Sequence, residues 1–262
     1  DAPNDPAHAT MTQALQAVRE GAPARAGDVL TAEAAALAAL QHAGYADAAL
    51  GERRVIVDHA SLRVNTDFHF TADSLVRLGS VRAEPSTAFR PSFIRSLRNW
   101  REGAAYTPEN LARLRRDLTA TGAVSRAATH LAPPDENGLR DVVLDVEPAR
   151  RNAYELGFGY STTEGAGVEA QWTRRNFTGR ADALTVSATL GELLSSASLT
   201  WARPHAAGLR HTFSLGVSGA HENTDAFTRD GVALFASVDA SSRIHVGRSY
   251  GVRLAADTYD SL

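Results

Sequence analysis

The stretch Tyr154-Glu155-Leu156-Gly157-Phe158-Gly159-Tyr160-Ser161 alternates between large apolar residues and small or charged ones. Because neighbouring side chains of a β-strand point to opposite faces, the apolar residues share one face and the glycines share the other. The alternation continues to Ala256, in further runs at 168–173, 184–190, 196–201, 212–218, 232–240 and 250–256. The second face carries mainly Ser, Thr and Gly, whereas a soluble sandwich would place charged residues there. This pattern is typical of a membrane β-barrel wall with a wet interior.

The alternating runs predict seven strands of about 8 to 11 residues, the length of a tilted strand that crosses the hydrocarbon layer. The sequence holds no apolar run of about 18 residues, so only a closed barrel could satisfy the backbone of a membrane-spanning chain. Bacterial single-chain barrels have an even number of strands, about eight or more. We therefore expect a fragment whose missing C-terminal part supplies the remaining strands. A soluble sandwich or lipocalin-like barrel is the alternative.

The first 149 residues contain an internal repeat. Gly27-Asp28-Val29-Leu30-Thr31 and Gly103-Ala104-Ala105-Tyr106-Thr107 each lead into a predicted helix, with Thr at the expected N-cap. Apolar residues at helical spacing follow, and the two helices end at Gly44 and Gly122. An earlier helix precedes each turn, carried by Met11, Leu15 and Val18 in the first copy and by Phe93, Ile94 and Leu97 in the second.

Each later helix is followed by two predicted strands, at 55–57 and 62–70 in the first copy and at 124–131 and 142–146 in the second. The second copy also has an opening strand at 75–84, and we expect that truncation has removed its counterpart in the first. The order predicts α+β modules. We expect a first module over 1–73, a second over 74–149, and the first part of an antiparallel transmembrane β-barrel over 150–262.

Two such modules directly before a barrel resemble the Omp85 superfamily of outer-membrane proteins, in which periplasmic POTRA domains precede the barrel. Within that superfamily the chain is most similar to TamA-type subunits of translocation and assembly modules. The residues that carry the resemblance are Ala43-Gly44-Tyr45-Ala46-Asp47-Ala48, Gly103 to Thr107, Glu147 to Thr162, and Arg175-Asn176-Phe177-Thr178-Gly179. Ala46 departs from the family, which usually has Phe after the Gly-Tyr pair.

The resemblance implies a protein of the bacterial outer membrane, with its POTRA modules in the periplasm, that helps β-barrel or autotransporter clients to insert or cross. Its expected partners are outer-membrane lipid, unfolded client proteins and a TamB-like periplasm-spanning protein. A candidate lateral seam lies in the first barrel strand, at Tyr154, Leu156, Gly157, Phe158, Gly159 and Tyr160, where the glycines weaken strand pairing. Those glycines could instead make room inside the lumen.

The edges of the module sheets are a second candidate for strand addition, with Val55 and Val57 in the first module and Val124 and Ala127 in the second. A plain spacer that holds the barrel away from a partner is the alternative for these modules.

Other functional classes lack their sequence signals. A net charge of −3 argues against a nucleic-acid partner. With no cysteine and no His-Glu-x-x-His pair, we expect no metal site, no cofactor and no catalytic residue, so the protein is expected not to be an enzyme. Two further functions stay open: a passive pore or two-partner secretion exporter, and an outer-membrane hydrolase whose site lies beyond residue 262.

Overall fold

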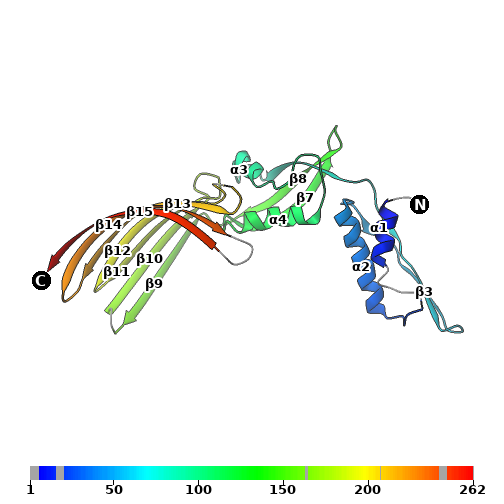
Figure 1. The fold of residues 1–262 in the computed structure, drawn as a ribbon, viewed down its shortest axis with the longest axis horizontal. Helices are drawn as coiled ribbons and strands as arrows, with labels where there is room; N and C mark the ends of the chain where they lie inside the picture. The colour runs from blue at the N-terminus through cyan, green and yellow to red at the C-terminus, as the bar shows by residue number, and fades with distance from the viewer. Residues whose placement is uncertain (1–5, 16–20, 163–164, 207, 242–246, 262) are drawn as a thin grey trace. The chain divides into compact units, whose positions relative to one another are not determined.

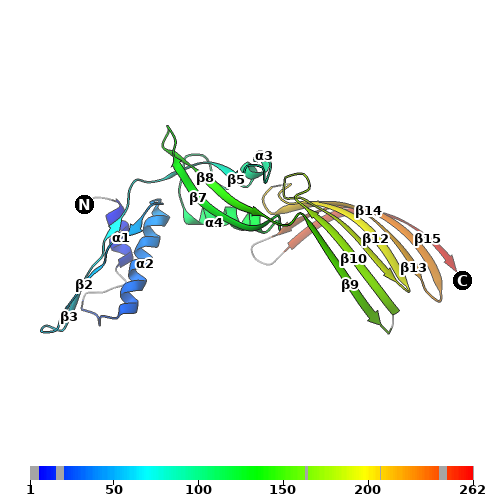
Figure 2. The same cartoon turned by 180° about the vertical axis from the view of Figure 1, so that it is seen from behind.

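The computed structural model describes residues 6–15, 21–162, 165–206, 208–241 and 247–261 (Figures 1 and 2). These residues form two compact units. The first unit contains residues 1–80, 99–113 and 131–142, and the second contains 81–98, 114–130 and 143–262. Most strands pair in antiparallel sheets and few helices are present, as the sequence predicts. The predicted domain boundaries at 73/74 and 149/150 stay predictions.

The first unit begins with two helices, α1 (Pro6–Leu15) and α2 (Ala26–Ala43). Ala7, Leu40, Tyr45 and Ala48 form a buried cluster here, and Met11, Leu37, Phe70 and Ala72 pack against it. The predicted helical residues Met11 and Leu15 lie in α1, whereas Val18 lies outside the residues that the structure describes. Gly44 ends α2 in the left-handed conformation, with φ at 109°, and this confirms the predicted helix end.

The predicted N-cap at Thr31 is wrong, because α2 already starts at Ala26. Thr31 lies inside the helix, where its Oγ1 donates a hydrogen bond to the carbonyl oxygen of Gly27 at 2.8 Å. A threonine hydroxyl in a helix can bond to the carbonyl one turn earlier, so Thr need not mark the start. The alanine-rich sequence around it favours helix on both sides of Thr31.

A hairpin follows α2, made of β1 (Ala49–Leu50), β2 (Arg54–Asp58), β3 (Arg63–Asp67) and β4 (Phe70–Thr71). β1 pairs with β4, and β2 pairs with β3. The single strand predicted over 62–70 is therefore divided. Leu62 lies in the turn with φ at 54°, and Phe68 lies between β3 and β4.

A four-stranded sheet with the order β6-β5-β8-β7 comes next, made of β5 (Arg77–Glu84), β6 (Ala104–Ala105), β7 (Val124–Pro134) and β8 (Leu139–Pro148). Its two helices are α3 (Pro91–Ser96) and α4 (Pro108–Thr119), both at the predicted positions. Most of the apolar residues in these elements are buried, among them Leu78, Ile94, Leu97, Leu114, Leu118 and Leu144. Leu75, the predicted start of the opening strand, lies before β5 and is 57% exposed. The 3.6-residue and two-residue periodicities therefore identified most of this core correctly.

The last part of the chain is one seven-stranded antiparallel sheet, which we call the wall. It consists of β9 (Asn152–Ser161), β10 (Gly165–Arg175), β11 (Ala183–Gly191), β12 (Leu194–Arg203), β13 (His211–Asn223), β14 (Phe227–Ser241) and β15 (Gly247–Ser261). Each strand pairs with its neighbours in chain order. The described strands leave β9 and β15 as the two edges, so they do not close a barrel.

The two faces of the wall match the predicted alternation. Tyr154, Leu156, Phe158 and Tyr160 are 75%, 73%, 80% and 78% exposed. The other face carries hydroxyl pairs across strands, with Ser187 Oγ 2.7 Å from Ser198 Oγ and Thr173 Oγ1 3.4 Å from Thr185 Oγ1. Among the described residues no helix combines the length and the apolar character needed to cross a membrane.

Gly44, which ends α2, and Gly27, which lies inside its first turn, give a matched test of the assigned helix end. Gly44→Ala should destabilise α2 by about 1 kcal/mol, because alanine is strained at positive φ and its Cβ would lie 3.1 Å from Leu75 Cδ2. Gly27→Ala should stabilise α2 by about 0.5 kcal/mol, since no atom lies within 4 Å of the added Cβ. Amide hydrogen exchange across α2 measures both changes. Equal effects of the two substitutions would contradict the assigned cap.

Candidate functional site

The predicted seam strand lies at an edge of the wall. β9 pairs with β10, and no other described strand pairs with it (Figures 1 and 2). All six seam residues, Tyr154, Leu156, Gly157, Phe158, Gly159 and Tyr160, belong to β9. The edge position was not contained in the alternation pattern itself, because that pattern does not distinguish edge strands from inner ones.

The register fixes which backbone groups of β9 face away from β10. The N–H of Arg175 donates to the carbonyl oxygen of Arg151 at 2.7 Å, just before the strand pairing begins. Hydrogen-bonded and non-hydrogen-bonded pairs alternate along an antiparallel ladder. Continuing that alternation from Arg151 places the N–H and C=O groups of Tyr154, Leu156, Phe158 and Tyr160 on the side away from β10. A strand added to the edge of β9 would form its backbone hydrogen bonds with these N–H and C=O groups.

The two seam glycines face small or flexible neighbours. Gly157 is opposite Glu169 and Gly159 is opposite Gly167. A Cβ at Gly159 would meet nothing within 4 Å, and one at Gly157 would make an ordinary contact with Glu169 Cβ at 3.6 Å. Within the described part of the chain, close packing therefore requires neither glycine.

The other predicted edges are also placed at sheet edges. Val55 and Val57 lie in β2, whose described partner is β3 alone, and both side chains are exposed. Val124 and Ala127 lie in β7, the outer strand of the four-stranded sheet. Val124 is buried, so at this position only the backbone edge of β7 can meet a partner.

The turn between β10 and β11 is anchored on the segment before α3. Asn176 Nδ2 donates to the carbonyl oxygen of Ala88 at 2.8 Å. The backbone N–H of Arg90 donates to Gly179 O at 2.8 Å, and its Nε donates to Thr178 O at 2.8 Å. Within the stretch from Arg175 to Gly179, the structure thus explains Asn176 by its side-chain hydrogen bond and Gly179 by its positive φ of 81°.

Asp182 orders the same turn from inside. Its side chain accepts hydrogen bonds from Trp201 Nε1 and from the backbone N–H of Thr178, both at 2.8 Å. Asp182 is fully buried. Burial alone would raise the pKa of Asp182, but the hydrogen bonds from Trp201 and Thr178 hold it below its ordinary value. The carboxylate of Asp182 is therefore ionised at neutral pH and accepts both hydrogen bonds in its charged form.

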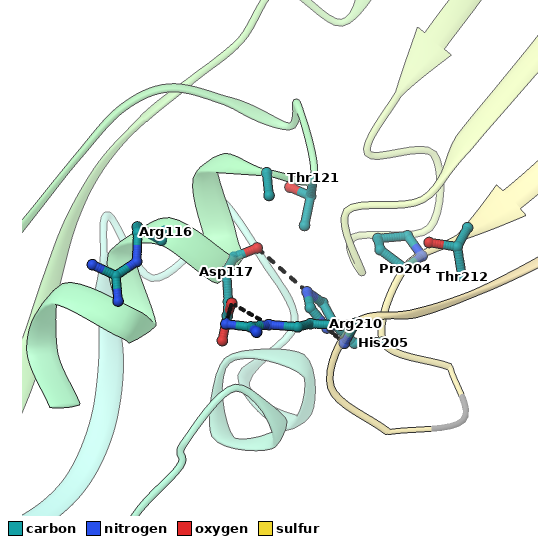
Figure 3. Close-up of a pocket in the computed structure, with 8 residues that line it drawn as sticks. Arg116, Asp117, Thr121, Pro204, His205, Arg210 and Thr212 are labelled. Atoms are coloured by element: carbon teal, nitrogen blue, oxygen red, sulfur yellow. Dashed lines mark hydrogen bonds and ion pairs between the residues drawn. The ribbon is translucent and has the colours of Figure 1, made fainter. Parts of the chain in front are cut away.

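A second anchor joins the end of α4 to the turn between β12 and β13 (Figure 3). Arg210 donates from Nε and Nη2 to Asp117 Oδ1, at 3.2 and 3.1 Å. His205 Nε2 lies 3.3 Å from the carbonyl oxygen of Asp117. Asp117 is only 5% exposed, whereas the Arg210 side chain is 27% exposed, so the carboxylate is the shielded partner of this ion pair. A cavity of about 300 Å³ beside it is lined by Arg116, Thr121, Pro204 and Thr212 as well.

Sequence reasoning missed both anchors, because their partners are far apart in the chain and follow no periodic pattern. The described residues contain no group of three or more His, Cys, Asp or Glu side chains arranged to hold a metal ion. The interaction that this geometry allows is strand pairing along β9. The two anchors hold the β10–β11 and β12–β13 turns of the wall in place.

A search against protein-family models found no match. In fold, the chain is similar to BamA from Haemophilus ducreyi lacking POTRA domains 1–3, with a TM-score of 0.84 and 15% sequence identity over 98% of this chain. It is also similar to CdiB from Escherichia coli, with a TM-score of 0.54 and 14% identity over 91% of this chain. The chain spans about half of these proteins, 49% of BamA and 47% of CdiB.

These similarities show the fold. Both neighbours share with this chain the helix-bearing modules and the antiparallel wall, and at 15% and 14% identity the likeness extends to the fold alone.

The buried carboxylate of Asp182 can be compared with an exposed one that has the same hydrogen-bonding role. Asp182→Ala should destabilise the wall by about 2 to 3 kcal/mol, because two partly buried donors lose a buried, charged acceptor. Asp135→Ala should have a much smaller effect. Asp135 Oδ1 also accepts two backbone N–H groups, at 2.9 and 2.7 Å, but this side chain is exposed to water.

Urea unfolding of the refolded protein measures the difference between these two variants. Because the pKa of Asp182 is lowered in the folded state, its contribution should be complete above about pH 4 and decrease at more acidic pH. Similar losses for Asp182→Ala and Asp135→Ala would contradict the role assigned to burial.

Proposed function

We propose that this protein is a non-enzymatic outer-membrane factor that assembles or translocates client proteins by offering β9 as a template strand. The observation that carries the proposal is the position of β9 at the edge of the wall, where one row of its backbone groups has no partner among the described strands. The fold shared with BamA and CdiB supports an outer-membrane assembly or translocation role in general.

The absence of water in the hydrocarbon layer is the physical reason that the edge of β9 would bind another strand. An unpaired N–H or C=O in hydrocarbon costs several kcal/mol, so β9 must pair either with a closing strand of its own barrel or with another strand. A client strand that adds to β9 gains backbone hydrogen bonds whatever its side chains are. Selectivity for alternating sequences follows, because Tyr154 and Phe158 stand on the lipid side and Gly157 on the other.

The modules before the wall serve as docking sites in this proposal. β2 and β7 each have one edge that no described strand pairs with, and this edge is offered to an extended segment of a client or of a periplasmic partner. The proposal places the wall in the bacterial outer membrane, in contact with lipid, and the modules in the periplasm.

At a finer level, we propose a TamA-type subunit that acts on autotransporter or β-barrel clients together with a TamB-like partner. The sequence from Glu147 to Thr162 and the turn residues Arg175 to Gly179 support this assignment. A two-partner secretion exporter is the second candidate, and the likeness of the fold to CdiB favours it over a passive pore. An exporter would pass its client through the lumen and would not pair it with β9.

Disulfide scanning tests the template role directly, because the chain has no cysteine of its own. Single cysteines at Tyr154, Leu156 and Phe158 in the full-length protein should form disulfides with a cysteine in the terminal strand of a stalled client. Leu199→Cys is the matched control, since Leu199 is also exposed on the wall but β12 is paired on both sides.

Disulfides from the β9 positions and none from Leu199 would support strand pairing. Equal yields at all positions would show unspecific contact with the wall. Disulfides only from positions facing the interior, such as Thr185→Cys and Thr200→Cys, would favour the exporter.

A further inference from the structure

His205 connects the turn between β12 and β13 to the end of α4 (Figure 3). Its Nδ1 accepts a hydrogen bond from the backbone N–H of Arg210 at 2.9 Å. Its Nε2 lies 3.3 Å from the carbonyl oxygen of Asp117 in α4. One imidazole ring therefore contacts the backbone on both sides of the second anchor.

These two partners assign the protonation state of the ring. A backbone N–H can only donate and a backbone carbonyl can only accept, so Nδ1 must be unprotonated and Nε2 must carry the hydrogen. The neutral ring fits this geometry. A proton on Nδ1 would point at the N–H of Arg210, so the hydrogen bond would be replaced by a repulsion between two donors.

The hydrogen bond from Arg210 N–H to His205 Nδ1 stabilises the backbone conformation in which the side chain of Arg210 reaches α4. His205 and Arg210 both have left-handed backbones, with φ at 56° and 67°. Such a conformation is uncommon for residues other than glycine and needs support from its surroundings. The supported turn directs the guanidinium of Arg210 to Asp117 Oδ1, which accepts hydrogen bonds from Arg210 Nε and Nη2.

His205 also completes the hydrogen bonding at the end of α4. Three of the last carbonyls accept bonds from the residues that follow: Arg116 O from Ala120 N, Leu118 O from Thr121 N, and Thr119 O from Gly122 N. The carbonyl of Asp117 lies between these and is the one that His205 Nε2 reaches. A cationic side chain such as Arg210 is also favourable at the C-terminal end of a helix.

We infer that the contact between α4 and the β12–β13 turn is a pH-sensitive latch, closed by neutral His205 and opened when Nδ1 of His205 takes up a proton. Opening removes the hydrogen bond from Arg210 N–H, and the turn then no longer holds the guanidinium against Asp117. The inference goes beyond the proposed function and does not depend on how clients bind.

The groups around His205 decide whether the latch opens as the pH falls or as it rises. Burial lowers the pKa of His205 below its ordinary value, and the positive charge of Arg210 acts in the same direction, whereas Asp117 opposes them. α4 also contributes Arg116 to the cavity, α3 contributes the uncharged ring of Phe93 at 6.3 Å, and the flanking strand ends carry Arg203 and His211. Because the folded-state pKa is lowered, the latch is complete above about pH 6.5 and is lost as the pH falls.

The distance between two spin labels measures whether the latch between α4 and the β12–β13 turn is closed or open. The labels are attached to Thr119→Cys on α4 and Ala206→Cys in the turn, both exposed, in the full-length protein refolded in lipid vesicles. Between about pH 7.5 and pH 5, a single short distance should give way to a mixture in which a longer distance grows. The change should reverse when neutral pH is restored.

Three variants separate His205 from other titrating groups. His205→Asn keeps an acceptor near the position of Nδ1, tolerates a left-handed backbone and does not titrate, so the short distance should persist at acidic pH. His205→Lys has no acceptor, so the longer distance should appear already at neutral pH. His221→Asn is the control, because exposed His221 lies 2.7 Å from Asp230 in the wall and should leave the profile unchanged.

The inference is overturned if the label distance of the unaltered protein does not respond to pH, or if His205→Asn opens at the same pH as the unaltered protein. It is also overturned if His205→Lys stays closed at neutral pH. A pH response that disappears in His221→Asn would assign the titration to the wall instead of to the latch.

Discussion

Backbone pairing between neighbouring strands is the interaction on which the wall depends. Each ladder fixes the face of every side chain, as when Trp172 pairs with Tyr154 on one side and with Val186 on the other. A slip of one residue would move the aromatic residues of β9 to the polar face, which makes the register strongly specified. The same pairing explains why the ends of the ladder matter. Wherever the last row of backbone groups meets hydrocarbon, it must find a partner strand.

Local patterns predicted most of the fold. The two-residue alternation identified all seven wall strands, because each of them has one apolar and one polar face. The helix end at Gly44 was predictable, since a left-handed residue after a helix is usually glycine. Thr31 failed as a start signal because its hydroxyl can bond within a helix as well as before one. The strand at 62–70 failed because alternation does not reveal where a hairpin turns or breaks.

The candidate site was predictable only in part. The seam and the module edges are segments of strands, so their residues could be named from periodicity, although their edge positions needed the sheet order. Asp117, His205 and Arg210 could not be predicted, because the contacts of Asp117 with the other two join positions 88 and 93 apart in the chain. Asp182 could not be predicted either, because one of its two donors, Trp201, lies 19 positions away in β12. Asp117 and Arg210 are 93 positions apart, and nothing in either local sequence points to the other. Buried polar pairs of this kind are set by tertiary packing.

The chain-order pairing of the wall also bears on how it folds. Every strand from β9 to β14 pairs with the strand that follows it, so each new contact closes only a short loop and loses little conformational entropy. Such local topology favours rapid folding, hairpin after hairpin. The pairing that would join β9 to a closing strand is different, because it spans the whole length of the wall. We infer that the pairing of β9 with a closing strand is the slowest step of folding. β9 is therefore the last strand of the wall to be paired on both sides.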